Sequence, residues 1–319
     1  MNKQNINLYL ASPRGFCAGV DRAVKIVEKA LKKYGPPVYV RHEIVHNEEV
    51  VDSLTKAGAV FVEEVSEAPE NSIMIFSAHG VPKTVFKEAK HRKMISIDAT
   101  CPLVTKVHNE TKKHSNKGNH ILLIGHNFHP EVIGTMGQVS KNKITLIQNK
   151  EDANNVIVKN PDKLAYATQT TLSVEDTEVI LKILKSRFPR INGPSTDDIC
   201  YATTNRQLAV KSMAKICNCI LVIGSKNSSN SKRLVEVAKV NGAKEAFLIS
   251  SEDDLTAFLE NYNPTFNSNL GLTSGASAPE TLIKVLITKL NKKFEVCQID
   301  HEVVKEDIHF NLPKSLRSI

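Results

Sequence analysis

The sequence contains no tryptophan, and its aromatic content is only 5%. Proteins that bind single-stranded nucleic acid by base stacking need a platform of aromatic side chains, so this class is disfavoured. Long apolar segments are also missing. The longest runs, residues 121–124 and 220–223, are far shorter than the roughly 20 residues that cross a bilayer. No transmembrane helix is expected.

The first residues lack the apolar core and small-residue cleavage site of a secretory signal. Only six cysteines occur in 319 residues, which is too few for a disulfide scaffold. These absences predict a cytoplasmic protein whose cysteines are thiols, so each cysteine needs its own explanation.

The residues that are present describe a globular chain, with 41% hydrophobic and 24% charged side chains. There are 42 basic and 34 acidic residues, which gives a formal net charge of +8. This charge favours anionic partners, among them nucleic acid, phosphorylated metabolites and acidic proteins. It does not choose among them.

Three of the cysteines mark an internal repeat. Cys17, Cys101 and Cys200 each end a predicted strand and open a predicted helix. The strands are residues 7–10, 94–97 and, more weakly, 197–199, and the helices cover about 20–34, 102–118 and 201–217. The same order of elements therefore occurs three times.

Each repeat continues with a second apolar strand and a polar cluster. The second strands are residues 38–40, 121–124 and 220–223, and the clusters hold His46, then His129 with Glu131, then Ser228, Ser229 and Asn230. After a helix come third strands at 60–62, 144–147 and 246–249 and fourth strands that lead to polar turns at 77–80, 167–171 and 273–277. Strands that alternate with helices predict mainly parallel sheets, with ligands at the carboxyl ends of the strands.

We therefore predict an α/β protein of three repeats related by a pseudo-threefold axis. The repeats span residues 1–97, 98–196 and 197–300, and residues 301–319 form a C-terminal tail. The alternative is that polar residues commonly follow strands in α/β proteins, which would make the repeat a coincidence.

If the repeats surround one axis, Cys17, Cys101 and Cys200 meet at its centre. A structural zinc site would need four ligands, usually with close Cys-x-x-Cys pairs, which the sequence lacks. A [4Fe-4S] cluster normally takes four cysteines, so three would leave one iron open to bind substrate. The alternative for any single cysteine is a small buried hydrophobe, and we expect this for Cys217, Cys219 and Cys297.

The other residues of the polar turns divide into two kinds. One set consists of donors that suit phosphate oxygens: His46, His79, Ser228, Ser229, Asn230 and Ser277. The second kind is an acid, Glu131, which lies near His129 in sequence and could form a proton relay with Thr170 or Thr171. The acidic pair Asp197 and Asp198 precedes a helix and is expected to act as a helix cap.

The remaining histidines are expected to be satisfied in the core or solvated. They are His91, His108, His114, His120, His301 and His309, whereas His126 is ambiguous because His126 and His129 could mimic a zinc pair.

Nine short motifs of this sequence resemble those of the 4-hydroxy-3-methylbut-2-enyl diphosphate reductase family, also called IspH or LytB. They occur at 13–20 (PRGFCAGV), 45–47 (VHN), 77–82 (SAHGVP), 98–102 (DATCP), 125–131 (GHNFHPE), 168–173 (TQTTLS), 198–200 (DIC), 224–231 (GSKNSSNS) and 275–280 (GASAPE). The resemblance covers about residues 7–300, and no site position departs from it.

The resemblance implies a trefoil of three α/β domains around a [4Fe-4S] cluster held by Cys17, Cys101 and Cys200. It also implies that the C-terminal tail, 301–319, packs across the domains. It implies reductive dehydroxylation of an allylic diphosphate to isopentenyl and dimethylallyl diphosphates, the last step of the non-mevalonate isoprenoid pathway. Glu131 would deliver protons, with His129 and Thr170 orienting it or the substrate hydroxyl. The diphosphate would be bound by His46, His79, Ser228, Ser229, Asn230 and Ser277.

The resemblance also suggests a monomer that takes electrons from flavodoxin or ferredoxin, both acidic proteins. The rival interpretation is a non-enzymatic iron-sulfur redox sensor that binds nucleic acid. The basic residues are dispersed, with only short clusters such as Lys112-Lys113 and Lys292-Lys293, and no helix-turn-helix or stacking motif is present. We therefore expect neither a nucleic-acid nor a membrane partner.

Overall fold

A computed structural model describes residues 3–265 and 268–317. The chain forms two compact units. Unit 1 comprises Met1–Ala18, His46–Glu48 and Tyr201–His309, and unit 2 comprises Gly19–Val45, Glu49–Cys200 and Phe310–Ile319. The strands form three sheets, and every pair of neighbouring strands runs parallel. The predicted α/β class with mainly parallel sheets is confirmed.

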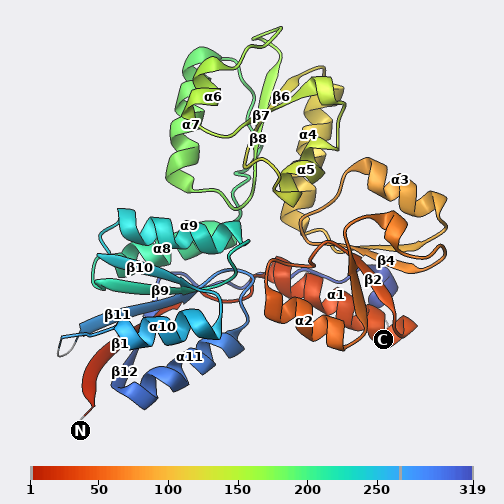
Figure 1. Ribbon diagram of the computed structural model, residues 1–319. Coiled ribbons are helices and arrows are strands. Elements are labelled where there is room, and N and C mark those ends of the chain that lie inside the picture. The colour runs from red at the N-terminus through yellow and green to blue at the C-terminus, as the bar shows by residue number, and fades with distance from the viewer. Residues whose placement is uncertain (1–2, 266–267, 318–319) are drawn as a thin grey trace. The chain divides into compact units, whose positions relative to one another are not determined.

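Unit 1 contains a five-stranded sheet with helices on both faces (Figure 1). In sheet order the strands are β10 (Glu245–Ile249), β9 (Cys219–Ile223), β11 (Ser268–Ser274), β1 (Gln4–Ser12) and β12 (Phe294–Glu302). The helices are α8 (Tyr201–Ala214), α9 (Ser229–Val240), α10 (Glu252–Asn261) and α11 (Glu280–Lys293). Successive side chains of β9 point to opposite faces: Leu221 packs with α10 and α11, and Val222 packs with α8 and α9.

Unit 2 contains a four-stranded and a three-stranded sheet. The first has the order β3 (Ala59–Val62), β2 (Val38–Arg41), β4 (Ile73–Phe76), β5 (Ile95–Asp98), and the second has the order β7 (Ile144–Ile147), β6 (His120–Ile124), β8 (Leu164–Thr168). The helices are α1 (Ala18–Tyr34), which belongs to this unit from Gly19 on, α2 (Glu48–Lys56), α3 (Lys83–His91), α4 (Pro102–Asn116), α5 (Pro130–Met136), α6 (Lys150–Asn155) and α7 (Val174–Arg187). Single turns of 3-10 helix occur at Val65–Glu67, Lys141–Lys143 and, in the tail, Lys314–Leu316.

The three-stranded sheet also has a core on each face. Leu122 and Ile124 of β6 pack with α6 and α7, and Ile121 and Leu123 pack with α4 and α5. In Figure 1 the two helix pairs flank this sheet. The continuous apolar run of β6 is therefore explained by burial on both sides.

The predicted elements occur with end shifts of a few residues, except before Cys200. Residues 197–199 form no strand and lie in a bend, so that prediction is wrong. The polar sequence Asp197-Asp198 explains the difference, because strands seldom contain adjacent acidic residues.

The strands before Cys17 and Cys101 pair with strands that belong to other parts of the chain than the predicted repeat that follows them. β1, the strand before Cys17, pairs with β11 and β12 near the other end of the chain, and β5, the strand before Cys101, closes the sheet of β2, β3 and β4. The boundaries at residues 97, 196 and 300 thus describe the repeat in the sequence, and the division into domains there stays a prediction.

The tail begins in unit 1 and ends in unit 2. Within unit 2, Arg22 donates a hydrogen bond to the carbonyl oxygen of Asn311 at 2.9 Å, and Leu316 is buried. Among residues 3–265 and 268–317, no helix is long and apolar enough to span a membrane.

Candidate active site

The loop after β1 holds Cys17 in unit 1 by backbone hydrogen bonds. The amide of Gly15, whose φ is +72°, donates to the Ser274 hydroxyl at 2.8 Å. The amide of Cys17 donates to the carbonyl oxygen of Ala276 at 3.1 Å. The Cys17 thiol is half-buried. Cys17 is therefore tied to the turn after β11, which also contains Ser277.

Four of the predicted diphosphate-binding residues belong to the same network of unit 1. Ser228 caps α9 by accepting a hydrogen bond from the Ser231 amide at 3.3 Å. The side-chain oxygen of Asn230 accepts from the Ala276 amide at 3.0 Å, and the Ser277 hydroxyl donates to the carbonyl oxygen of His46 at 2.9 Å. Ser229, half-buried, is the first residue of α9.

The side-chain nitrogen of Asn230, Nδ2, is a buried donor without a partner among the described residues. Asn230 is only 4% exposed, and it lies in the first turn of the twelve-residue helix α9. A buried donor is costly unless it is satisfied, and a helix N-terminus attracts anions. Asn230 and the start of α9 therefore suit an anionic ligand.

In unit 2, Glu131 is a deeply buried carboxyl group, 3% exposed. Its two oxygens accept hydrogen bonds from Thr170, one from the amide at 2.7 Å and one from the hydroxyl at 2.9 Å. Burial raises the pKa of Glu131 from 4.5 to about 7, with a smaller contribution from the charge of Asp198, although both hydrogen bonds from Thr170 lower it. This carboxyl group can therefore change protonation state near neutral pH.

His129 lies directly beside Glu131 at the start of α5. Its Nδ1 accepts a hydrogen bond from the Glu131 amide at 3.2 Å, so in the neutral ring the proton resides on Nε2. The ring meets the His79 ring edge to face at 5.9 Å. His79 in turn makes a hydrogen bond with Ser77 at 3.3 Å through Nδ1.

Close packing fixes His79 against this helix. Gly134 of α5 lies so near the turn at 77–82 that an added Cβ would be 2.9 Å from the carbonyl oxygen of Gly80. Gln138 donates hydrogen bonds to the carbonyl oxygens of Val81 and Gly134, both at 2.9 Å. The turn that carries His79 and the helix that follows His129 thus form one rigid contact.

Cys101 and Cys200 are half-buried residues of unit 2, and the backbone amide of each donates a hydrogen bond. The Cys101 amide donates to the carbonyl oxygen of Ala78 at 2.9 Å, beside His79 in sequence, and Cys101 is the N-cap of α4. The Cys200 amide donates to the carbonyl oxygen of Thr170 at 3.1 Å. A continuous chain of contacts therefore runs from Cys101 through the two histidines and Glu131 to Cys200.

Several residues near these cysteines carry charge. Arg22 donates hydrogen bonds to the carbonyl oxygens of Ala99 and Thr100; burial lowers its pKa, and the nearby Asp98 and Cys101 raise it. The helix-cap role expected for Asp197 and Asp198 stays a prediction. The buried carboxylate of Asp198 accepts a hydrogen bond from the Thr168 amide at 3.0 Å and pairs with Lys106 at 3.1 Å. Burial raises the pKa of Asp198, and these two contacts lower it.

The predicted site residues thus form two groups. Unit 1 holds Cys17, His46, Ser228, Ser229, Asn230 and Ser277, and unit 2 holds His79, Cys101, His129, Glu131, Thr170 and Cys200. Each group is connected by the contacts described above, apart from Ser229, which is placed by its position in α9. In the described part of the chain, no three His, Cys, Asp or Glu side chains form a site for a single metal ion.

The other cysteines differ from one another. Cys217 and Cys219 are buried, and burial raises the pKa of both thiols to about 12, as expected for inert core residues. Cys297 is exposed on edge strand β12, so the prediction that it is buried is wrong. Along the nine residues of β12, exposed and half-buried side chains follow the buried Phe294. The short apolar run Val296-Cys297 did not indicate this exposure.

His108 departs in part from expectation, because it is buried but one of its ring nitrogens is not satisfied. It is 7% exposed, burial lowers its pKa to about 4, and its Nε2 has no partner among the described residues. Its ring contacts Gly80, where an added Cβ would lie 2.6 Å from Cε1.

Sequence reasoning overlooked one large buried charge, Arg206, which is 0% exposed. Its position was a detectable signal: it lies four residues after Ala202 and four before Val210, on the buried face of α8.

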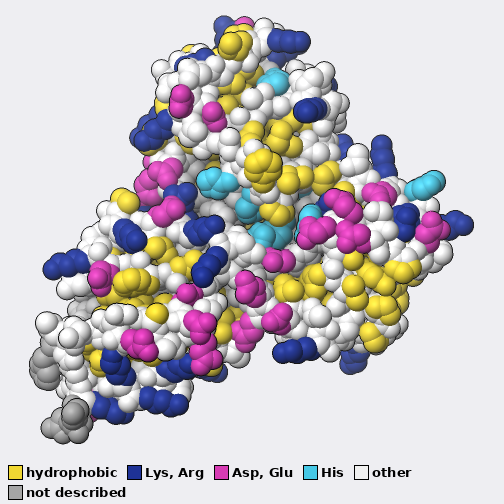
Figure 2. All heavy atoms as spheres, viewed as in Figure 1, with side chains coloured by type: hydrophobic (Ala, Val, Ile, Leu, Met, Phe, Trp, Pro, Cys, Tyr) yellow, Lys and Arg dark blue, Asp and Glu magenta, His cyan; other side chains and the backbone are white. Residues whose placement is uncertain are grey.

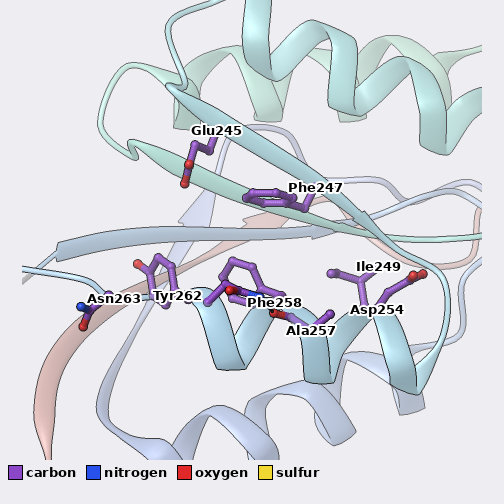
Figure 3. A pocket seen from close by; sticks show the side chains of 9 residues that line it. Glu245, Phe247, Ile249, Asp254, Ala257, Phe258, Tyr262 and Asn263 are labelled. Atoms are coloured by element: carbon purple, nitrogen blue, oxygen red, sulfur yellow. Dashed lines mark hydrogen bonds between the residues drawn. The ribbon is translucent and has the colours of Figure 1, made fainter.

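A cavity of about 500 Å³ lies elsewhere in unit 1, between β10 and α10. Figure 3 shows Phe247, Phe258 and Tyr262 along it, with Asn263 at one end and Asp254 at the other. None of the predicted site residues lines this cavity.

Comparison with known proteins decides the family. The family model described as LytB protein matches residues 8–291. The chain belongs to the LytB family. A LytB relative from Roseobacter denitrificans, named 4-hydroxy-3-methylbut-2-enyl diphosphate reductase, is 52% identical over 318 residues, which cover 99% of each chain. A relative of the same name from Gluconobacter oxydans is 52% identical over 98% of this chain and 93% of its own length.

Solved LytB structures agree. The E-1-hydroxy-2-methyl-but-2-enyl-4-diphosphate reductase from Plasmodium falciparum has a TM-score of 0.90 and 38% identity, covering 99% of this chain and 97% of that one. A second structure, described as (E)-4-hydroxy-3-methyl-but-2-enyl diphosphate reductase, the terminal enzyme of the non-mevalonate pathway, has a TM-score of 0.62 and 29% identity, covering 90% and 99%. None of these four matches is named as a sensor or a nucleic-acid-binding protein.

Proposed function

We propose that this LytB protein reduces 4-hydroxy-3-methylbut-2-enyl diphosphate to isopentenyl and dimethylallyl diphosphates. The reaction consumes two electrons and two protons, breaks the allylic C–O bond and releases water. The full-length similarity to relatives named for this reaction supports the proposal. The observation that carries it is Glu131, a buried acid with a pKa of about 7 beside His129 and Thr170.

The diphosphate binds, in this proposal, to His46, His79, Ser228, Ser229, Asn230 and Ser277. The unpartnered amide of Asn230 and the N-terminus of α9 supply donors for anionic oxygens. No carboxylate belongs to this set, so nothing in it repels the ligand. The orientation of Asn230 is fixed, because its side-chain oxygen already accepts from the Ala276 amide.

The cofactor is one [4Fe-4S] cluster held by Cys17, Cys101 and Cys200, with one iron left for the substrate. These three thiols fit such a group: all are half-buried, none forms a disulfide, and the amide of each is held by a backbone carbonyl. A cluster binds each cysteine through a different iron, so it requires sulfurs spaced more widely than a single ion does. When bound, it supplies electrons and a Lewis-acidic iron for the substrate hydroxyl.

Glu131 delivers the two protons, one to the leaving hydroxyl and one to the allylic carbon chain. At a pKa of about 7 a substantial fraction of the carboxyl is protonated at neutral pH, which is the condition for an efficient general acid. Thr170 fixes both carboxyl oxygens by two hydrogen bonds. The Nδ1 atom of His129 accepts a hydrogen bond from the Glu131 amide, so His129 helps to orient the first turn of α5, and the neutral ring carries its proton on Nε2.

The electron donor is proposed to be a flavodoxin or a ferredoxin, and the protein a cytoplasmic monomer. The net charge of +8 suits an acidic donor. Figure 2 shows Lys and Arg scattered among Asp and Glu on the face in view, without a continuous basic stripe, which gives no support for nucleic-acid binding.

The test is oxidation of reduced viologen by anaerobically purified, iron-replete protein, with and without the diphosphate substrate. Substrate-dependent oxidation and formation of both isoprenoid diphosphates are expected. Glu131→Gln should still bind substrate, measured by the change in the cluster spectrum, but should lose turnover. Oxidation that does not respond to substrate in cluster-loaded protein would refute the proposal, and wild-type turnover by Glu131→Gln would remove Glu131 from the reaction.

A further inference from the structure

Arg206 is the largest fully buried side chain of the described residues, and it lies in unit 1. One terminal nitrogen, Nη1, donates to the carbonyl oxygen of Ala202 and to a carboxylate oxygen of Glu306, both at 3.0 Å. The other, Nη2, donates to the carbonyl oxygen of Gly15 at 2.8 Å. Desolvation of a guanidinium is costly, so its partners must be firmly placed.

The carbonyl that Arg206 contacts belongs to the cysteine loop. Gly15 precedes Cys17 by two residues, and its amide is already held by Ser274 at 2.8 Å. Because Arg206 donates to the Gly15 carbonyl, both the amide and the carbonyl of Gly15 are hydrogen-bonded. Gly15 itself has a φ of +72°. Together with the bond from the Cys17 amide to Ala276, these contacts define the backbone that carries the thiol.

The counter-charge comes from the C-terminal part of the chain. The Glu306 side chain is 15% exposed and follows β12 by four residues. Besides Arg206 it accepts a hydrogen bond from the Asn205 side chain at 3.1 Å. Glu306 therefore supplies the negative charge beside the buried guanidinium of Arg206.

We propose that Arg206 is a positioning residue for the cysteine ligand Cys17, and that Glu306 acts by holding Arg206 in place. The inference rests on the proposed function, because it assigns the clamp to a cluster ligand. It adds two residues outside the predicted site, and it connects the cysteine loop near the N-terminus with the segment after β12.

The first experiment measures the rate at which a chelator removes the cluster under anaerobic conditions from wild type, Glu306→Gln and the matched control Glu302→Gln. Glu302 lies four residues away, and its exposed carboxylate contacts Lys305. Loss of a residue that orients a metal ligand typically weakens the metal site about 10- to 100-fold. Glu306→Gln should therefore lose the cluster at least about tenfold faster, with an altered spin-resonance signal. Glu302→Gln should match wild type.

A second variant separates positioning from a general structural role. In Arg206→Met/Glu306→Met the buried pair is replaced by apolar side chains, a change that often preserves stability. Gly15 nevertheless loses the donor to its carbonyl. The double variant should unfold near the wild-type temperature yet lose its cluster rapidly. A folded double variant with wild-type cluster loss would overturn the proposal, and so would one that fails to fold, because the pair would then serve the fold as a whole.

The two proposals fail differently. If wild-type protein binds no cluster on reconstitution, or its cluster does not respond to the diphosphate, the proposed function is wrong. If wild type binds the cluster and responds, but Glu306→Gln matches Glu302→Gln in chelation rate and spectrum, only the positioning role is wrong.

Discussion

Replacing Glu131 with Gln should stabilise the protein, and the gain should depend on pH. Glu131 is buried and has a pKa of about 7 in the folded chain, against an ordinary value of 4.5. The folded state therefore holds the proton more tightly than the unfolded state does. The stability associated with the protonated carboxyl is complete below pH 4.5 and is lost as the pH rises through 7. Glutamine resembles the protonated form at every pH.

The magnitude follows from the difference in pKa. Each unit corresponds to about 1.4 kcal/mol, so a rise of about 2.5 units costs the wild type about 3 kcal/mol once the pH exceeds 7. Glutamine keeps an oxygen that can accept from the Thr170 amide, and its NH2 can donate to the Thr170 hydroxyl. Both hydrogen bonds of this pair can therefore be kept, the second with its direction reversed.

The assay is urea unfolding of wild type and Glu131→Gln at pH 5.0 and pH 8.5, with exposed Glu178 of α7, as Glu178→Gln, for a control. The two proteins should differ little at pH 5.0, and Glu131→Gln should be the more stable by up to about 3 kcal/mol at pH 8.5. Glu178→Gln should show no such change. A stability difference for Glu131→Gln that is the same at both pH values would refute the reasoning, since it would mean that the carboxyl group does not titrate differently on folding.

Three further substitutions test other contacts. Cys101→Ser should lose the cluster, measured by iron content and absorbance, whereas Cys217→Ser in the core should keep it; equal iron in both variants would contradict the ligand assignment. Gly134→Ala should cost about 1–3 kcal/mol and raise the KM for the diphosphate, because its Cβ would meet the Gly80 carbonyl at 2.9 Å; unchanged unfolding and KM would show that α5 can shift freely. Phe128→Gly should stabilise by up to about 1 kcal/mol in urea unfolding, since exposed Phe128 has a φ of +63°; destabilisation would show that its ring makes a needed contact.

The sequence predicted the elements well because their signals are local. Helices such as α1 show apolar residues at helical spacing, and β6 and β9 are apolar runs that are buried on both faces. The polar turns were identified as sites because they follow strands of a parallel sheet. The contact between Glu131 and Thr170 fits this rule, since both follow strands of the same sheet, β6 and β8.

Other features were missed because long-range contacts decide them. Nothing near β1 in the sequence indicates that it pairs with β11 and β12, more than 250 residues later. The contacts of Asp198 with Thr168 and Lys106 join residues from other parts of the chain, which its local sequence does not indicate. Arg206 was overlooked for the same reason, because its significance depends on Gly15 and Glu306. Buried polar groups acquire their roles from distant partners, which single-sequence patterns do not reveal.

The position of β1 has a consequence for synthesis on the ribosome. β1 is made first, yet it lies between β11 and β12, which are made among the last residues. Most of unit 2 is made before Cys200 and can fold while the chain is still growing, whereas the sheet of unit 1 cannot close until β12 has emerged. The contacts that hold the Cys17 loop, to Ser274 and to Ala276, likewise cannot form until the end of β11 has been made. Of the three cysteines proposed to hold the cluster, Cys17 would therefore be the first to be made and the last to be placed.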